Sequence, residues 1–213
     1  MRFSGPPTAL LPIVAAALFG PLLAWRRLGP LDFWGGMSVS VAVLVILSCV
    51  TDKSQRSALL QDWKEGLAKK IGLGLLSALA LYGVFWAGNA VSRAVLPAAA
   101  KDIEAVYAFR QDAAIIRIGL LIVFVIGPGE ELFWRGFLQR RWQKRLGQTL
   151  GWLLAAGFYA VVHVSSGNPM LVLSALVCGL YWGALYTRFR SAILVAVSHT
   201  LWDLLIFTIF PLG

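Results

Sequence analysis

Charged residues are scarce in this chain. Asp, Glu, Lys and Arg make up 14% of the 213 residues, whereas ordinary soluble domains carry about 25%. Hydrophobic residues make up 59% and the mean hydropathy is +0.75, against roughly 45–50% hydrophobic residues in soluble domains. Apolar runs long enough to cross about 30 Å of hydrocarbon recur along the whole length. This composition argues against a soluble domain and predicts an all-α, polytopic transmembrane bundle in which residues 1–213 form a single integral-membrane domain.

Cysteine is rare as well. The chain has two cysteines, Cys49 and Cys178, and both lie inside apolar runs, which is typical of buried small hydrophobic residues. They therefore carry no information about the redox compartment. A cleavable signal peptide is not evident, because the first apolar run is too long, is interrupted by prolines and continues into Arg26 and Arg27. We expect this run to be retained as the first span.

The net charge of +9 does not indicate a nucleic-acid partner. The basic residues form short clusters between apolar runs, as the determinants of membrane topology do. If the N-terminus is cytoplasmic, the inside segments hold 12 Lys and Arg residues, Arg2 among them, and the outside segments hold 5. This bias predicts a cytoplasmic N-terminus. The short loops and basic inside segments favour an integral protein of a bacterial inner (plasma) membrane, with the lipid bilayer as its surroundings.

Seven apolar segments are expected to cross the membrane as helices. They cover approximately residues 8–25, 33–50, 71–91, 114–139, 149–166, 169–189 and 191–210. Residues 92–113, which contain mixed charges and Pro97, are expected to form a long connection. The fourth span is unusual because its last third is charged.

The connection between the second and third spans has an amphipathic pattern. Within residues 57–70, Leu59, Leu60, Trp63 and Leu67 fall on one helical face, and lysines lie elsewhere. This pattern predicts a short interfacial helix in the headgroup layer, with a solvated loop as the alternative.

Ionisable residues at membrane depth are few, and such residues usually face the interior of a bundle and mark function. They are Arg117, Glu130, Glu131, Arg135, His163, His199 and Asp203. Both histidines of the chain belong to this set, so the candidate catalytic residues are taken from its members.

The stretch GPGEELFWRGF contains two adjacent carboxylates. Neighbouring positions on a helix point about 100° apart, so Glu130 and Glu131 cannot serve the same face. Glu131 and Arg135 are four residues apart, in the order that favours an ion pair. Arg135 can hold Glu131, or bridge toward Glu130, while one carboxylate stays free to act as a base. Residues 127–129 are expected to loosen the helix before the carboxylates. The alternative is a helix end whose charges extend to the headgroups.

The histidines supply the other half of a hydrolytic site. His199 and Asp203 share a helical face, and Asp203 can orient the imidazole; a lone His163 in an apolar helix can also be a packing residue. A carboxylate and a histidine can deprotonate a water for attack on an amide carbonyl, while a second histidine stabilises the oxyanion. Zinc is an alternative cofactor, with Glu130, His163 and His199 as its ligands. The H-E-x-x-H pattern is missing, however, so the residues alone leave the cofactor open.

Three short motifs occur in order along the last four predicted spans: EELFWR at 130–135, YAVVH at 159–163 and HTLWD at 199–203. Together they resemble the CAAX protease and bacteriocin-processing family of intramembrane endopeptidases, which includes the CAAX prenyl endopeptidase. That family carries E-E-x-x-x-R, then F-x-x-x-H, then H-x-x-x-N or a variant with Asp. Here Tyr159 replaces the usual phenylalanine, and Asp203 replaces the commoner asparagine.

The resemblance covers approximately residues 114–210, which hold all of the candidate catalytic residues. It implies that Glu130 and His163 activate the water and that Glu131 and Arg135 support them. It further implies an endopeptidase that cleaves a membrane-anchored protein or peptide, in protein maturation or in the removal of a sorting tail.

The resemblance also implies that His199 and Asp203 form the oxyanion site. Since a carboxylate cannot donate a hydrogen bond unless it is protonated, orientation of His199 is the alternative role for Asp203. Two rival functions use the same charges: a transporter or proton relay, and a non-catalytic membrane scaffold. A transporter would spread its ionisable groups across the membrane and show related halves, whereas here the groups cluster and no repeat is found.

Overall fold

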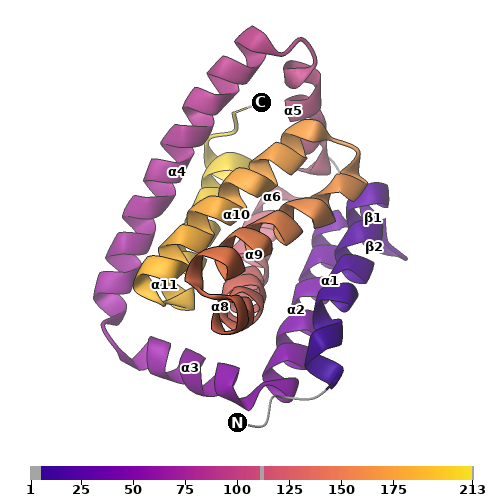
Figure 1. The fold of residues 1–213 in the computed structure, drawn as a ribbon. Helices are drawn as coiled ribbons and strands as arrows, with labels where there is room; N and C mark the ends of the chain where they lie inside the picture. Colours follow the sequence, from indigo (N-terminus) through magenta and orange to yellow (C-terminus); the bar gives the residue numbers. More distant parts are fainter. Residues whose placement is uncertain (1–5, 111–112, 213) are drawn as a thin grey trace.

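Long helices dominate the computed structural model, which describes residues 6–110 and 113–212 (Figure 1). The α-helices are α1 (Pro6–Trp25), α2 (Phe33–Thr51), α3 (Lys53–Lys64), α4 (Leu67–Val95), α5 (Ala99–Tyr107), α6 (Ile115–Leu121), α7 (Gly127–Phe133), α8 (Arg140–Leu146), α9 (Gln148–His163), α10 (Pro169–Phe189) and α11 (Ala192–Leu204). The shorter elements are β1 (Arg27–Leu28), β2 (Leu31–Asp32), the 3₁₀ turns η1 (Ala108–Arg110) and η4 (Val164–Ser166), and the π-helical segments η2 (Ile122–Ile126), η3 (Trp134–Gln139) and η5 (Leu205–Ile209). The predicted all-α, polytopic bundle is confirmed, with one two-residue hairpin between α1 and α2.

The predicted spans correspond to observed helices. Among the described residues, six helices are long and apolar enough to cross a membrane: α1, α2, α4, α9, α10 and α11 with η5. A seventh span is obtained if the bent pair of Ala99–Arg110 and Ile115–Leu146, which meet at 90°, counts as one. The helix α4 extends the predicted third span at both ends. Arg2, which entered the charge count for topology, lies outside the described residues.

A helix occupies the segment with the amphipathic pattern, as predicted, and no solvated loop is found there. The helix α3 crosses between the end of α2 and the start of α4 in Figure 1. Leu60 and Trp63 are 63% and 61% exposed, so its apolar side chains are available to the bilayer surface. The helix ends before Leu67, which belongs to α4, because Gly66 adopts a left-handed conformation at φ +59°.

Residues 92–113 are more regular than a loop. The helix α4 continues to Val95, and after a turn around Pro97 the chain forms α5 and η1. Ile103 and Val106 on α5 face the cavity described below. The mixed charges of this segment made it resemble a loop in the sequence, but α5 is an amphipathic helix whose apolar face covers the cavity.

The fourth predicted span is a long helix, Ile115–Leu146, in which η2 and η3 flank α7. Pro128 has no N–H and its ring would clash with the carbonyl four residues earlier, so a wider turn is needed before it. That turn is η2, where the N–H of Gly127 bonds to the carbonyl of Ile122. Residues 127–129 themselves are α-helical, so the expectation that they loosen the helix is wrong in detail: the widened turns lie on either side of α7.

The glycines of α7 allow close helix packing. A Cβ on Gly127 would lie 2.2 Å from Oγ1 of Thr200 in α11, and a Cβ on Gly129 would lie 2.2 Å from Cγ1 of Val41 in α2. In α10, a Cβ on Gly179 would lie 3.1 Å from the backbone of Ala156 in α9. The missing side chains of these glycines allow the approaches without displacing a neighbour, and they bring α7 close to α11 and α10 close to α9, where the candidate residues lie.

Candidate active site

A buried ion cluster joins α7 and η3 to α11. Nη1 of Arg135 and Nδ1 of His199 each lie 2.7 Å from Oε1 of Glu131. The three residues are only 2%, 0% and 3% exposed, in the order Arg135, Glu131 and His199. The structure thus resolves the open choice for the arginine: it pairs with Glu131 along its own helix. Burial also excludes the alternative in which these charges extend to the headgroups.

Asp203 lies on the other side of the imidazole. Its Oδ2 is 3.4 Å from Nε2 of His199, so a carboxylate faces each ring nitrogen. A neutral imidazole donates at only one nitrogen, and therefore both contacts can be hydrogen bonds only for an imidazolium. The contact with Asp203 is longer than an ordinary N–H···O bond, whereas the contact with Glu131 is short. His199 is thus fixed at Nδ1 and more loosely held at Nε2.

Glu130 has different surroundings from its neighbour. It is 2% exposed, it lines an apolar cavity described below, and its Oε2 accepts a hydrogen bond of 3.0 Å from the hydroxyl of Tyr159. The hydroxyl that distinguishes Tyr159 from the usual phenylalanine therefore has a partner in the site. Two carboxylates at adjacent positions are divided between two roles, one inside an ion cluster and one at a cavity wall.

His163 is connected to Glu130 through the same tyrosine. Its Nδ1 lies 2.7 Å from the carbonyl oxygen of Tyr159, and the two rings meet edge to face at 4.7 Å. A carbonyl oxygen can only accept a hydrogen bond, so Nδ1 carries the hydrogen and the neutral ring presents the lone pair of Nε2. His163 is half-buried and lines the cavity.

Sequence reasoning missed the aromatic residue that holds this cluster. Trp182 of α10 stacks on His199 at a ring separation of 3.8 Å, and its Nε1 donates to Oγ of Ser198. The guanidinium of Arg135 lies 5.2 Å from the ring centre of Tyr159 and 5.4 Å from that of Trp182. Such cation–π contacts stabilise a buried cation. A tryptophan in an apolar span gives no sequence signal for this role.

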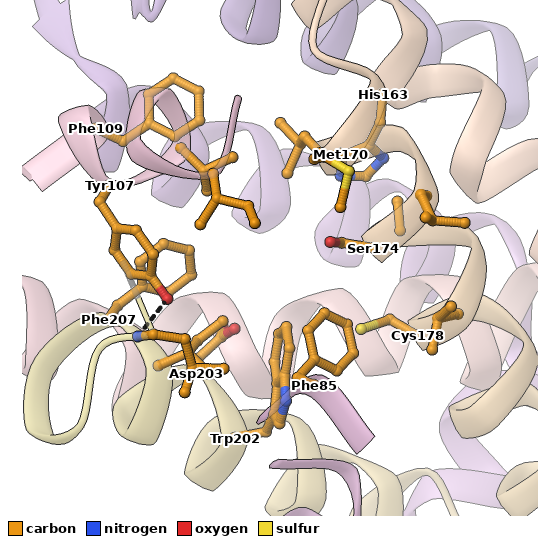
Figure 2. A pocket seen from close by; sticks show the side chains of 18 of the residues that line it. Phe85, Tyr107, Phe109, His163, Met170, Ser174, Cys178, Trp202, Asp203 and Phe207 are labelled. Carbon is orange, nitrogen blue, oxygen red and sulfur yellow. Dashed lines mark hydrogen bonds between the residues drawn. The ribbon is translucent and has the colours of Figure 1, made fainter. Parts of the chain in front are cut away.

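An apolar cavity of about 250 Å³ lies among α2, α4, α5, α7, α9, α10 and α11 (Figure 2). Its polar lining includes Glu130, Tyr159, His163, His199 and Asp203, whereas most of the wall is apolar, with Phe85, Met170, Trp202 and Phe207 among the residues. Glu131 and Arg135 are not part of the lining. The structure therefore brings all six predicted residues into one region, four of them at the cavity and two behind it.

The zinc alternative finds no preformed ligand set. Among the residues that the structure describes, no group of three or more His, Cys, Asp or Glu side chains is arranged to hold a metal ion. In particular, both nitrogens of His199 face carboxylates of the protein. Glu130, His163 and His199 line one cavity but would have to rearrange before they could bind one ion.

Comparison with known proteins supports the resemblance that the motifs indicated. No curated protein and no solved structure matches this chain. Residues 112–205 match the model of a family described as type II CAAX prenyl endopeptidase Rce1-like. This segment contains α6 to α11 and all three motifs. Over residues 112–205, the chain is thus similar to the Rce1-like, CAAX prenyl endopeptidase family.

Proposed function

We propose that this protein is an intramembrane endopeptidase that cleaves a membrane-tethered protein or peptide with a water activated by Glu130 and His163. The observation that carries the proposal is the division of the two adjacent carboxylates. Glu131 is bonded to Arg135 and His199, whereas Glu130 faces an apolar cavity, and among the described residues only the hydroxyl of Tyr159 is bonded to it. The matched family, whose members are endopeptidases, supports an enzyme.

In the proposed reaction, a water lies between the carboxylate of Glu130 and Nε2 of His163. Glu130 takes one proton while the water oxygen attacks the carbonyl carbon of the scissile peptide bond, and the electron pair of the C=O bond moves to the oxygen. When this tetrahedral intermediate collapses, the C–N bond breaks and the leaving nitrogen takes the proton from Glu130. The products are a carboxylic acid and an amine, so that no covalent enzyme intermediate is required.

His199 is suited to stabilise the oxyanion. His199 lines the cavity, and its Nε2 is loosely held at 3.4 Å from Asp203, so Nε2–H can donate to a developing negative charge there. Nδ1 stays anchored on Glu131, whose own charge is held by Arg135. In this proposal Asp203 orients His199 rather than donating to the oxyanion.

We propose a metal-free reaction, because the imidazole of His199 is already engaged at both nitrogens by carboxylates of the chain. Cleavage by the reconstituted protein is then expected to persist after exhaustive treatment with a strong zinc chelator. Loss of cleavage that returns on addition of zinc would instead support the alternative ligand set of Glu130, His163 and His199.

For the substrate and the cellular location, we propose a class of each. The apolar cavity inside a membrane bundle favours a substrate tethered in the bilayer, and the family description makes a prenylated C-terminal peptide one candidate. Protein maturation and removal of a sorting tail are the processes that we propose. The excess of basic residues on one side supports an inner-membrane protein with its N-terminus in the cytoplasm.

Glu130→Gln is the decisive variant. It keeps the size and the hydrogen bond from Tyr159 but cannot accept the proton, so cleavage of a tethered reporter peptide in proteoliposomes should fall by about 10²–10⁴-fold. Glu65→Gln, at an exposed position between α3 and α4, is the matched control and should cleave at the rate of the unmodified protein. Undiminished cleavage by Glu130→Gln at normal expression would contradict the mechanism. Ion flux that this substitution abolishes, without any proteolysis, would support a transporter.

A further inference from the structure

A non-helical segment of the chain itself reaches the cavity wall. After η5, Phe210–Leu212 runs between α4 and α5 in Figure 1, and Leu212 is part of the cavity lining together with Glu130 and Asp203. The backbone N–H of Leu212 donates to the hydroxyl of Tyr107 at 2.9 Å, the bond that is dashed in Figure 2. Leu212 is therefore held at the wall of the cavity.

A second side chain holds the same residue. Nδ2 of Asn89 in α4 donates to the carbonyl oxygen of Leu212 at 2.8 Å. The orientation of this amide is fixed, because Oδ1 of Asn89 accepts from Nε of Arg93 at 2.9 Å. The backbone N–H and C=O of Leu212 are thus bonded by side chains of two different helices. Asn89 and Tyr107 also line the cavity, so that this pair joins the peptide backbone to the site.

We propose that Asn89 and Tyr107 form a backbone clamp for an extended, apolar stretch of the substrate, and that Leu212 occupies the clamp in this structure. The inference rests on the proposed function for the identity of the ligand. Bonds to the backbone N–H and C=O accept any residue type, whereas the apolar wall selects a leucine-like side chain. The carboxylates of Glu130 and Asp203 at the same cavity disfavour an acidic one. Residues 210–212 and the substrate therefore compete for the clamp formed by Asn89 and Tyr107.

Peptide binding tests the clamp without any cleavage. The probe is a fluorescent peptide with the sequence TIFPL of residues 208–212, and binding is measured in detergent on the inactive Glu130→Gln protein. Adding Leu212→Asp should displace residues 210–212 from the clamp, because a carboxylate is disfavoured in this cavity. Binding of the peptide should therefore tighten about tenfold. Adding Asn89→Asp should then weaken it by about 2- to 10-fold, because an ionised carboxylate cannot donate the hydrogen bond that Nδ2 of Asn89 gives to the backbone carbonyl.

Tyr107→Phe provides a second, independent removal of one clamp bond and should weaken binding to a similar extent. Tyr181→Phe is its matched control: it also removes a hydroxyl that bonds to the backbone, at the carbonyl of Ser77, but it does not line the cavity. Binding in Tyr181→Phe should equal that in the parent protein. Equal affinities in the parent, Leu212→Asp, Asn89→Asp and Tyr107→Phe proteins would overturn the clamp.

Cleavage kinetics separate this inference from the proposed function. In the active protein, Leu212→Asp should lower KM for the reporter and Asn89→Asp should raise it, with kcat unchanged in both, because the clamp acts on binding alone. If Glu130→Gln abolishes cleavage while neither substitution changes KM, the clamp is wrong and the proposed function stands. If the peptide binds through the clamp but the unmodified protein cleaves no tethered reporter, the proposed function is wrong and the binding site stands.

Discussion

The contact between α7 and α11 allows a quantitative test at Gly127. A Cβ at this position would lie 2.2 Å from Oγ1, 3.0 Å from Cβ and 3.0 Å from Cα of Thr200. Among the described residues, Oγ1 of Thr200 has no hydrogen-bond partner, so the hydroxyl is free to rotate away. The two carbon contacts would remain and are shorter than the 3.4 Å at which ordinary contact begins. In Gly127→Ala, α7 and α11 must therefore move apart.

This movement acts directly on the ion cluster. Glu131 lies one helical turn after Gly127, and His199 directly precedes Thr200, so the 2.7 Å bond between Glu131 and His199 crosses the contact that must open. Overpacking of this kind costs about 1–3 kcal/mol of stability. A misplacement of about 1 Å in a catalytic geometry can cost about 10²-fold in rate. A shift of a few tenths of an ångström should therefore reduce cleavage by about tenfold.

The assay combines thermal unfolding in detergent with cleavage of the tethered reporter in proteoliposomes. Gly119→Ala is the matched control, because it adds a methyl group on α6 toward Leu204 of the same partner helix, at an ordinary contact distance of 3.7 Å. It should leave both readouts unchanged. Thr200→Ala in the Gly127→Ala protein should restore part of the stability, since it removes the closest atom. Gly127→Ala with the stability and rate of Gly119→Ala would refute the reasoning.

Further predictions concern the ionisable groups. Arg135→Met should destabilise the protein by about 3–5 kcal/mol by leaving the Glu131 carboxylate partly uncompensated, whereas Arg117→Met, at an arginine side chain that is 46% exposed, should cost less than about 1 kcal/mol; equal losses in unfolding experiments would contradict this. Burial alone would raise the pKa of Asp52, but hydrogen bonds from Ser54 and the charges of two arginines outweigh it and hold that pKa below its usual 3.8. This contribution to stability is therefore present above about pH 4 and is lost as the pH falls through the lowered pKa, and Asp52→Asn should show a flatter pH dependence of unfolding in that range. Tyr159→Phe removes the only protein hydrogen bond found for Glu130 among the described residues, and unfolding should show a loss of about 1–3 kcal/mol, with no loss if the carboxylate needs no donor.

The spans and the ion pair could be predicted because they depend on local patterns. The segment 169–189 coincides with α10, since an apolar run bounded by Asn168 and Arg190 leaves little choice of helix ends. The pairing of Glu131 with Arg135 follows from a spacing of four residues on one helix. Period and spacing are properties of a short stretch, so the sequence contains them directly.

The contacts between helices could not be predicted in the same way. The hydroxyl of Tyr159 reaches Glu130 across 29 positions, and Trp182 stacks on a histidine of the next helix. Nothing in an apolar run indicates which aromatic faces the site, because lipid-facing and interior aromatic residues are equally hydrophobic. The helix α5 was missed for a related reason: its mixed charges resemble a loop until the cavity that its apolar face covers is known.

The stretch GPGEELFWRGF contains three charged residues, Glu130, Glu131 and Arg135. They can be buried because each has different surroundings in the fold. Arg135 and Glu131 neutralise one another, and the aromatic rings beside the guanidinium replace part of its hydration. His199 and Asp203 lie together on α11, with Nε2 of His199 3.4 Å from Oδ2 of Asp203. In the part of the chain that the structure describes, no ion pair is found for Glu130, which faces an apolar cavity where its charge is costly. A carboxylate in that position gains most by taking a proton, and a water beside His163 is the group that can supply one.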